Sequence, residues 1–242
     1  MNNRILYCDD SFAIVNKIAG EVCSFEDGKE NDEFYLPKVF KNHISERLGY
    51  TPEIIECVNR IDKPVSGIVI LALSKEANKE LSLQLKFHKI QKKYFAIVEG
   101  CFKAFPKEKE SCLLHDILFF NKKNQKSYIL NKNKVNKEDG KDAKLLYRVV
   151  GCGERYSFLE IQLLTGRTHQ IRCQLANNKM PIKGDLKYGA KRSEKNGGIR
   201  LHAGFISLFH PKTKEKMDFY ADFPYEDNLW AAFHENIKEM YE

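Results

Sequence analysis

The sequence lacks a long hydrophobic run, which excludes a chain that crosses a membrane. Its longest strongly apolar stretch, Ile68 to Leu73, is far shorter than the roughly 20 residues that span a bilayer. The first residues, Met1 to Arg4, lead into a strand-like stretch and not into the apolar core of a signal peptide. We therefore expect neither a membrane protein nor an exported one, and we expect a cytoplasmic location.

The chain also lacks the short motifs that hold metals, dinucleotides or nucleotide phosphates. Its seven cysteines are odd in number and no two are two or three residues apart, so they offer neither a zinc knuckle nor a Cys-x-x-Cys redox site. Neither a Gly-x-Gly-x-x-Gly turn nor a Walker loop is present. We expect reduced thiols, no metal and no cofactor.

What is present is an ordinary globular composition with a local excess of positive charge. Of the 242 residues, 43% are hydrophobic and 30% are charged, which is typical of a compact folded protein. The net charge is +7, and residues 121–148 hold nine basic and three acidic residues, a net charge of +6. This concentration favours an anionic partner, and a solvated loop that only aids solubility is the alternative.

Hydrophobic spacing and turn residues predict short strands and four helices. Gly49 suits the end of one helix, and Ser74 and Thr168 are placed to cap two others. We expect strands at residues 5–8, 12–16, 54–58, 68–73, 94–98, 157–163, 205–209 and 217–220, and helices at 36–48, 75–88, 168–175 and 226–241.

These elements predict an α+β fold with a mixed, largely antiparallel central sheet and flanking helices, because the strands are joined by short turns as well as by helices. We expect one domain over residues 1–242, with a division into two lobes near residue 105. Basic loops or ribbons are expected within residues 103–144.

One polar loop concentrates charge. Residues 59–67 read Asn-Arg-Ile-Asp-Lys-Pro-Val-Ser-Gly and place the carboxylate of Asp62 between two cations, just before a buried-looking strand. Nearby positive charge lowers the pKa of a carboxyl group and burial raises it, so Asp62 stays ionised where the cations prevail. Taken alone, Arg60 and Asp62 would form a structural salt bridge.

Several further blocks follow this loop in a fixed order. Residues 93–100 read Lys-Tyr-Phe-Ala-Ile-Val-Glu-Gly, residues 164–172 read Leu-Thr-Gly-Arg-Thr-His-Gln-Ile-Arg, and residues 181–185 read Pro-Ile-Lys-Gly-Asp. Together with the loop, they resemble the RluA-type family of pseudouridine synthases over about residues 5 to 225. Two departures stand out: Asn59 occupies the place of the usual His, and Pro64-Val65 replaces a small polar pair.

The resemblance implies the pseudouridine synthase catalytic fold with its active-site cleft. It implies an enzyme that isomerises specific uridines of ribosomal RNA or transfer RNA to pseudouridine. The N1–C1′ glycosidic bond breaks, the uracil rotates and C5 rejoins C1′, without a cofactor. The target base must leave its stack first, at a cost of about a few kcal/mol. RNA is the expected partner, no protein partner is implied, and a monomer is the default.

The resemblance also assigns three catalytic residues. Asp62 matches the catalytic aspartate, which attacks the sugar or assists its activation. Arg167 matches the arginine that pairs with this aspartate and keeps it charged. Tyr94 matches the pocket tyrosine, which can stack on uracil and lies where the C5 proton must be removed. Without the family, Arg167 would be a surface arginine and Tyr94 a half-buried strand residue.

RNA contacts are expected from the same loop and from the lysine-rich segment. Arg60 is expected to enter the space left by the flipped base, with a salt bridge to Asp62 as the alternative. Because the first expected strand lies close to Met1, we expect no small N-terminal RNA-binding domain, and the lysines take its place. The predicted RNA-binding residues are Arg60, Lys63, Lys122, Lys123, Lys126, Arg172 and Leu201, of which Leu201 is expected to line the pocket.

Two other functions fit part of the sequence. A retaining glycoside hydrolase also works at a C1′-type centre, but it needs two carboxylates and only Asp62 has a motif around it. A non-catalytic RNA-binding or assembly factor would keep the fold and lose the activity. The presence of Asp62, Tyr94 and Arg167 argues against this second alternative.

Overall fold

The structure, a computed structural model, describes residues 4–24, 33–102, 111–130, 140–224 and 228–241. The chain forms two compact units. The first comprises residues 1–92 and 203–223, and the second comprises residues 93–202 and 224–242. The first boundary thus lies at residues 92–93 and not near residue 105, and the chain returns to the first unit before it ends in the second.

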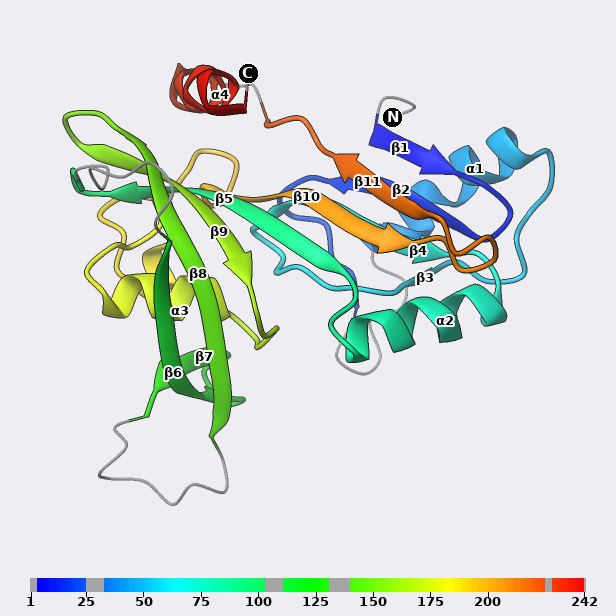
Figure 1. Ribbon diagram of the computed structural model, residues 1–242, viewed down its shortest axis with the longest axis horizontal. Coiled ribbons are helices and arrows are strands. Elements are labelled where there is room, and N and C mark those ends of the chain that lie inside the picture. The colour runs from blue at the N-terminus through cyan, green and yellow to red at the C-terminus, as the bar shows by residue number, and fades with distance from the viewer. Residues whose placement is uncertain (1–3, 25–32, 103–110, 131–139, 225–227, 242) are drawn as a thin grey trace. The chain divides into compact units, whose positions relative to one another are not determined.

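The first unit is a sheet with two helices (Figure 1). In this sheet β2 lies between β1 and β4, and β4 is followed by β10, while β3 pairs with β4 and β11 pairs with β10. Its elements are β1 (Ile5–Cys8), β2 (Phe12–Lys17), α1 (Leu36–Leu48), β3 (Glu56–Cys57), β4 (Ser66–Ala72), α2 (Lys75–Lys86), β10 (Leu201–Phe209) and β11 (Lys216–Tyr220).

The core of this unit follows the period of two along its strands. Phe12 and Ile14 of β2 and Ile68 and Ile70 of β4 point to one face, where Leu81 of α2 packs on them. Alternate residues of a strand share a face, so each strand supplies every second side chain to this core. Each such buried side chain stabilises the fold by about 1.5–3 kcal/mol relative to an exposed one.

Both helices of the first unit lie where the sequence predicts them. Gly49 adopts the left-handed conformation with φ of 78°, and its N–H donates to the carbonyl of Ser45 at 2.9 Å, which ends α1. The Ser74 hydroxyl accepts from the N–H of Ala77 at 3.2 Å and caps α2. The strands predicted at residues 5–8 and 12–16 are β1 and β2, those predicted at 205–209 and 217–220 lie in β10 and β11, and each of these two pairs is antiparallel.

The second unit contains a long antiparallel ribbon. Its strands lie in the order β5-β9-β8-β6-β7, and Figure 1 shows β6 and β8 side by side with α3 against the ribbon. The strands predicted at residues 94–98 and 157–163 lie in β5 and β9, whereas β6 and β8 are not among the predicted strands. The elements are β5 (Gln91–Glu99), β6 (Cys112–Asn121), β7 (Lys126–Ile129), β8 (Lys141–Cys152), β9 (Tyr156–Leu163), α3 (Gln170–Asn177), the 3₁₀ turn at Leu186–Tyr188, and α4 (Asn228–Tyr241).

Helix α3 begins later than the sequence predicts, and Thr168 does not cap it. The residue before the helix is His169, with φ of 54° and no side-chain cap. The amide oxygen of Gln170 instead accepts from the N–H of Arg167 at 3.0 Å and from the hydroxyl of Thr165 at 2.8 Å. The prediction was wrong because a side chain inside the first turn holds the preceding loop, and such a contact has no sequence signal.

The strand pairs with defined register among the described residues are antiparallel, and helices pack on the sheets. This confirms the predicted α+β class with a largely antiparallel sheet. In the part of the chain that the structure describes, we find no helix of sufficient length and hydrophobicity to pass through a bilayer. Residues 103–110 and 131–139, within the predicted basic insertions, lie outside the described residues.

Candidate functional site

The charged loop at residues 59–67 joins β3 to β4 in the first unit. Asn59 is buried and ties the start of this loop to β4: its Oδ1 accepts from the N–H of Ile70 at 2.7 Å and its Nδ2 donates to the carbonyl of Ile68 at 3.3 Å. Asn59, which departs from the family pattern, is therefore a fully bonded structural residue. Both of its polar atoms have partners, as a buried amide requires.

A buried lysine holds the middle of the same loop. Lys17, at the end of β2, is 0% exposed. Its ammonium donates to the carbonyl of Val65 at 2.6 Å, of Lys63 at 3.1 Å and of Asp62 at 3.3 Å, and to that of Ile18 at 3.1 Å. Lys17 is not among the residues predicted from the sequence, because a lysine at a strand end carries no motif.

The burial of Lys17 has an electrostatic consequence. Desolvation lowers the pKa of Lys17 to about 8, although Cys23, Glu21 and Asp62 act in the opposite direction. Burial in a low-dielectric environment disfavours the charged form of an amine. Burial of a charged group costs free energy, and the carbonyl oxygens around the ammonium replace part of its lost hydration. The same hydrogen bonds hold the loop.

The predicted site residues of the loop are more exposed than Asn59 and Lys17, which hold its backbone. Asp62 is half-buried, and its carbonyl also accepts from the N–H of Val65 at 3.0 Å, which closes a turn around residues 62–65. Arg60 and Lys63 are exposed. The loop therefore presents a carboxylate and two cations on a backbone fixed by Asn59 and Lys17.

The other two predicted catalytic residues belong to the second unit. Tyr94 is buried on β5. Arg167 is exposed in the loop before α3, and its Nε donates to the carbonyl of Asp142 at 2.9 Å. The pairing of Arg167 with Asp62 stays a prediction.

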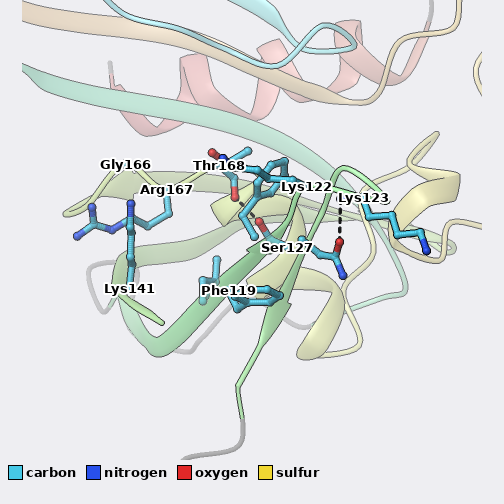
Figure 2. Close-up of a pocket in the computed structure, with 11 residues that line it drawn as sticks. Phe119, Lys122, Lys123, Ser127, Lys141, Gly166, Arg167 and Thr168 are labelled. Atoms are coloured by element: carbon cyan, nitrogen blue, oxygen red, sulfur yellow. Dashed lines mark hydrogen bonds between the residues drawn. The ribbon is translucent and has the colours of Figure 1, made fainter. Parts of the chain in front are cut away.

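Arg167 lines a cavity of about 640 Å³ within the second unit (Figure 2). The cavity lies among β6, the β6–β7 turn, β8 and the loop at residues 166–168. Four of its lining residues are cations and none is acidic. Its lining residues are Leu118, Phe119, Phe120, Asn121, Lys122, Lys123, Ser127, Lys141, Gly166, Arg167 and Thr168.

The β6–β7 turn that carries two of these cations is held in shape. Asn121 accepts from the N–H of Lys123 at 2.9 Å, and the hydroxyl of Ser127 donates to the carbonyl of Thr168 at 2.6 Å, as the dashed lines in Figure 2 mark. The N–H of Ser127 donates to the Tyr188 hydroxyl at 2.8 Å. Lysine ammonium groups on a fixed turn with aromatic neighbours suit a phosphate-bearing ligand with stacked bases.

The three predicted lysines of this turn differ in their surroundings. Lys122 and Lys123 are exposed, whereas Lys126 is half-buried with its ammonium 5.0 Å from the centre of the Tyr188 ring. A cation over an aromatic face is attracted by the ring quadrupole. Lys126 therefore contributes to packing as well as to the local positive charge.

Arg172 is buried, and its predicted role in RNA binding stays a prediction. It is 5% exposed, and its Nε and Nη2 donate to the two carboxylate oxygens of Asp185 at 2.6 and 2.9 Å. Its guanidinium carbon also lies 5.1 Å from the centre of the Tyr188 ring. A bidentate pair of this kind leaves the guanidinium committed to the protein interior.

Leu201, predicted to line the pocket, is buried at the start of β10, and its role stays a prediction. Among the described residues, no group of three or more His, Cys, Asp or Glu side chains is arranged to hold a metal ion.

Four cations line the cavity of the second unit, and such a lining suits a phosphate-bearing ligand. The sequence pattern of the family described as RNA pseudouridylate synthase matches residues 11–177. The chain belongs to this family. It is thus a pseudouridine synthase, an isomerase with RNA as its partner, as the sequence predicts.

Relatives that are named as pseudouridine synthases agree with this membership. The chain is 33% identical to the uncharacterized RNA pseudouridine synthase YlyB of Bacillus subtilis, over 99% of this chain and 74% of that protein. It is 30% identical to ribosomal large subunit pseudouridine synthase C of Buchnera aphidicola subsp. Baizongia pistaciae, over 93% and 68%. It is 28% identical to tRNA pseudouridine synthase C of Yersinia pestis, over 90% and 85%.

Solved structures show the same fold. Human RNA pseudouridylate synthase domain containing 4 matches with a TM-score of 0.72 and 18% identity, over 98% of this chain and 93% of that one. Human RNA pseudouridylate synthase domain containing 1 matches with a TM-score of 0.68 and 21% identity, over 91% and 83%.

Proposed function

We propose that the protein converts specific uridines of ribosomal RNA or transfer RNA to pseudouridine, with Asp62 as the residue that starts the chemistry. The observation that carries this proposal is the loop at residues 59–67, which matches the family loop and whose backbone is fixed by Lys17 and Asn59. The relatives named ribosomal large subunit pseudouridine synthase C and tRNA pseudouridine synthase C both resemble this chain, which supports both RNA classes.

In the proposed reaction the uridine leaves its stack and presents C1′ to the Asp62 carboxylate. The N1–C1′ bond breaks, the uracil turns, and C5 bonds to C1′. The proton on C5 is then removed and N1 gains a proton, so the base keeps its composition. We propose that Tyr94 stacks on the uracil and lies where the C5 proton is removed. Arg167 is the proposed partner that orients the Asp62 carboxylate.

RNA binding is proposed to use the loop cations and the cation-lined cavity. Arg60 and Lys63 are exposed beside Asp62, and Lys122, Lys123 and Lys141 line the cavity with Arg167. Phosphate contacts from lysine and arginine supply affinity without reading sequence. The cytoplasmic location expected from the sequence remains a proposal.

The test is release of tritium from [5-³H]uridine-labelled RNA by the wild type and by Asp62→Asn. We expect the Asn variant to lose catalysis by several orders of magnitude and to keep its fold and RNA affinity, because the substitution retains volume and removes the charge. The matched control is Asp10→Asn, which removes an exposed carboxylate paired with Lys212 in the same unit. Near-wild-type release by Asp62→Asn would contradict the assigned role.

The same assay separates the two alternative functions. If the protein were a non-catalytic RNA-binding factor, the wild type would bind RNA but release no tritium. A glycoside hydrolase would liberate free uracil and leave an abasic sugar, which nucleoside analysis of the product detects. Mapping pseudouridines in total RNA with and without the gene then identifies the RNA and the position.

A further inference from the structure

The loop before α3 is held by one buried glutamine, Gln170, the first residue of that helix. Gln170 is 2% exposed. Its amide oxygen accepts from the N–H of Arg167 at 3.0 Å and from the hydroxyl of Thr165 at 2.8 Å, and its Nε2 donates to the carbonyl of Lys144 at 3.0 Å. The N–H of Gln170 in turn donates to the carbonyl of Arg167 at 3.0 Å. One residue thus bonds both main-chain polar groups of Arg167.

The anchor of this arrangement is the main chain of Lys144 in β8. Its carbonyl also accepts from the N–H of Leu164 at 3.0 Å and from the N–H of Thr165 at 3.1 Å. Its N–H donates to the Thr165 hydroxyl at 2.8 Å. Strand β8 lies between β9 and β6 and pairs with both. Gln170 therefore ties Arg167 to a strand that is paired along both edges.

The backbone between Arg167 and Gln170 adopts a conformation that its residues do not favour. His169 has φ of 54°, in the left-handed region that a non-glycine residue rarely occupies. Such a conformation persists where the surrounding contacts determine it. The bonds from Gln170 to Arg167 are contacts of this kind, and Nδ1 of His169 lies 3.0 Å from the Tyr188 hydroxyl. The loop is therefore shaped by its hydrogen bonds.

We propose that Gln170 is a positioning residue for Arg167 and affects turnover through the Arg167 guanidinium. A guanidinium carries five N–H donors, of which the one on Nε is bonded to the carbonyl of Asp142 at 2.9 Å and the other four are on the Nη groups. Because the main chain and Nε are both held, the Nη groups keep one direction. A side chain that is already ordered binds an anionic group at a lower entropic cost.

The precision of this hold matters for the rate. A displacement of about 1 Å in a group that orients the reaction can reduce turnover by about 10²-fold. The effect on turnover rests on the proposed function, in which Arg167 orients the Asp62 carboxylate. The positioning of the Arg167 main chain does not rest on it, so the two are measured separately.

The first measurement is hydrogen exchange of the Arg167 amide in the full-length protein by nuclear magnetic resonance. In the wild type we expect slow exchange, because this N–H is bonded to a buried acceptor. In Gln170→Met we expect exchange about tenfold faster, which corresponds to the loss of one hydrogen bond. Gln84→Met is the matched control. Gln84 is a buried glutamine of the first unit whose two amide atoms bond the main chain of Phe209, so its loss should leave the Arg167 amide unchanged.

The second measurement is tritium release at saturating RNA. We expect Gln170→Met to lower kcat by about 10²-fold, and to have little further effect in the Arg167→Ala background, because residues that act as one unit are not additive. Gln84→Met should keep its turnover. Gln170→Glu retains an oxygen acceptor for the Arg167 N–H and should lose less turnover than Gln170→Met. A merely structural role predicts the reverse order, since a buried carboxylate costs more stability than a thioether.

The wild-type exchange rate decides the positioning even if a variant fails to fold. Unprotected exchange of the Arg167 amide in the wild type, or unchanged protection in Gln170→Met, would overturn the proposal. Additive losses of turnover from Gln170→Met and Arg167→Ala would overturn the action through Arg167. Wild-type release by Arg167→Ala would instead overturn the role of Arg167 in the proposed function, while the exchange rates would still show whether Gln170 holds its main chain.

Discussion

At the scale of single residues, Lys17 shows how one buried cation fixes a functional loop. Its ammonium donates to carbonyls on both sides of residue 64, and none of these contacts involves a motif residue's side chain. Asn59 performs the equivalent task at the start of the loop. The position of Asp62 is therefore set by residues that take no part in the proposed chemistry.

Lys17→Met is expected to lower the free energy of unfolding by about 1–3 kcal/mol, because it removes the donor from a group of buried carbonyls. Turnover should fall by about 10²-fold as the loop loses its support. Chemical denaturation and tritium release measure the two effects. Lys79→Met, on the exposed side of α2, is the control and should change neither; an unaltered rate in Lys17→Met would contradict the supporting role.

The same residue predicts a pH dependence. The folded pKa of Lys17, about 8, lies below its ordinary value of 10.5, so between these values the unfolded chain binds more protons than the folded one. The stability of the wild type relative to Lys17→Met should therefore rise with pH from about 8 to about 10.5, by on the order of 3 kcal/mol. Urea titrations of both proteins across this range measure the difference, and a flat or falling difference would contradict the pKa shift.

At the scale of secondary-structure elements, the β6–β7–β8 ribbon places Lys122 and Lys123 on an exposed surface beside the cavity. The β6–β7 turn is held by Asn121 and by Ser127, whose backbone and side chain bond to Tyr188 and Thr168. Lys122 and Lys123 therefore extend from an ordered turn beside a cavity, and not from a featureless loop. Lys126 differs from them because it packs on the Tyr188 ring.

Changing Lys122 and Lys123 together to Gln is expected to weaken binding to every RNA tested. Each phosphate contact steepens the fall of log affinity with log salt by about 0.7–0.9, so the slope should flatten by about 1.4–1.8. Affinity measured over a salt series gives both slopes. The matched control changes the exposed Lys38 and Lys41 of α1, and superimposable slopes for wild type and Lys122→Gln/Lys123→Gln would reject the proposed surface.

At the scale of the whole molecule, the proposed catalytic residues are divided between the two units. Asp62 belongs to the first, and Tyr94 and Arg167 belong to the second. The chain is divided in sequence as well, because residues 203–223 return to the first unit. A functional assembly of these residues requires the whole chain, and we expect neither unit alone to be active.

The predicted pairing of Asp62 with Arg167 is tested by a double-mutant cycle. Arg167→Ala should lower turnover by orders of magnitude, and adding it to Asp62→Asn should cost far less than the two single losses combined, because residues that act as one unit are not additive. Stability should follow the same pattern, since Asp62→Asn removes the charge that Arg167→Ala leaves without its partner. Strictly additive effects on both turnover and unfolding would count against direct contact.

Sequence by itself determined the family, the α+β class and most of the local elements. Periodic apolar residues, Gly49 and Ser74 act within a few positions of the chain, so helices α1 and α2 could be predicted from short-range spacing. The Asp62, Tyr94 and Arg167 blocks were recognisable because chemistry restricts residue type at fixed positions. Only the tertiary structure decided which residues support them. Lys17 and the Arg172–Asp185 pair depend on contacts between residues that are separated in sequence, which no short-range pattern shows.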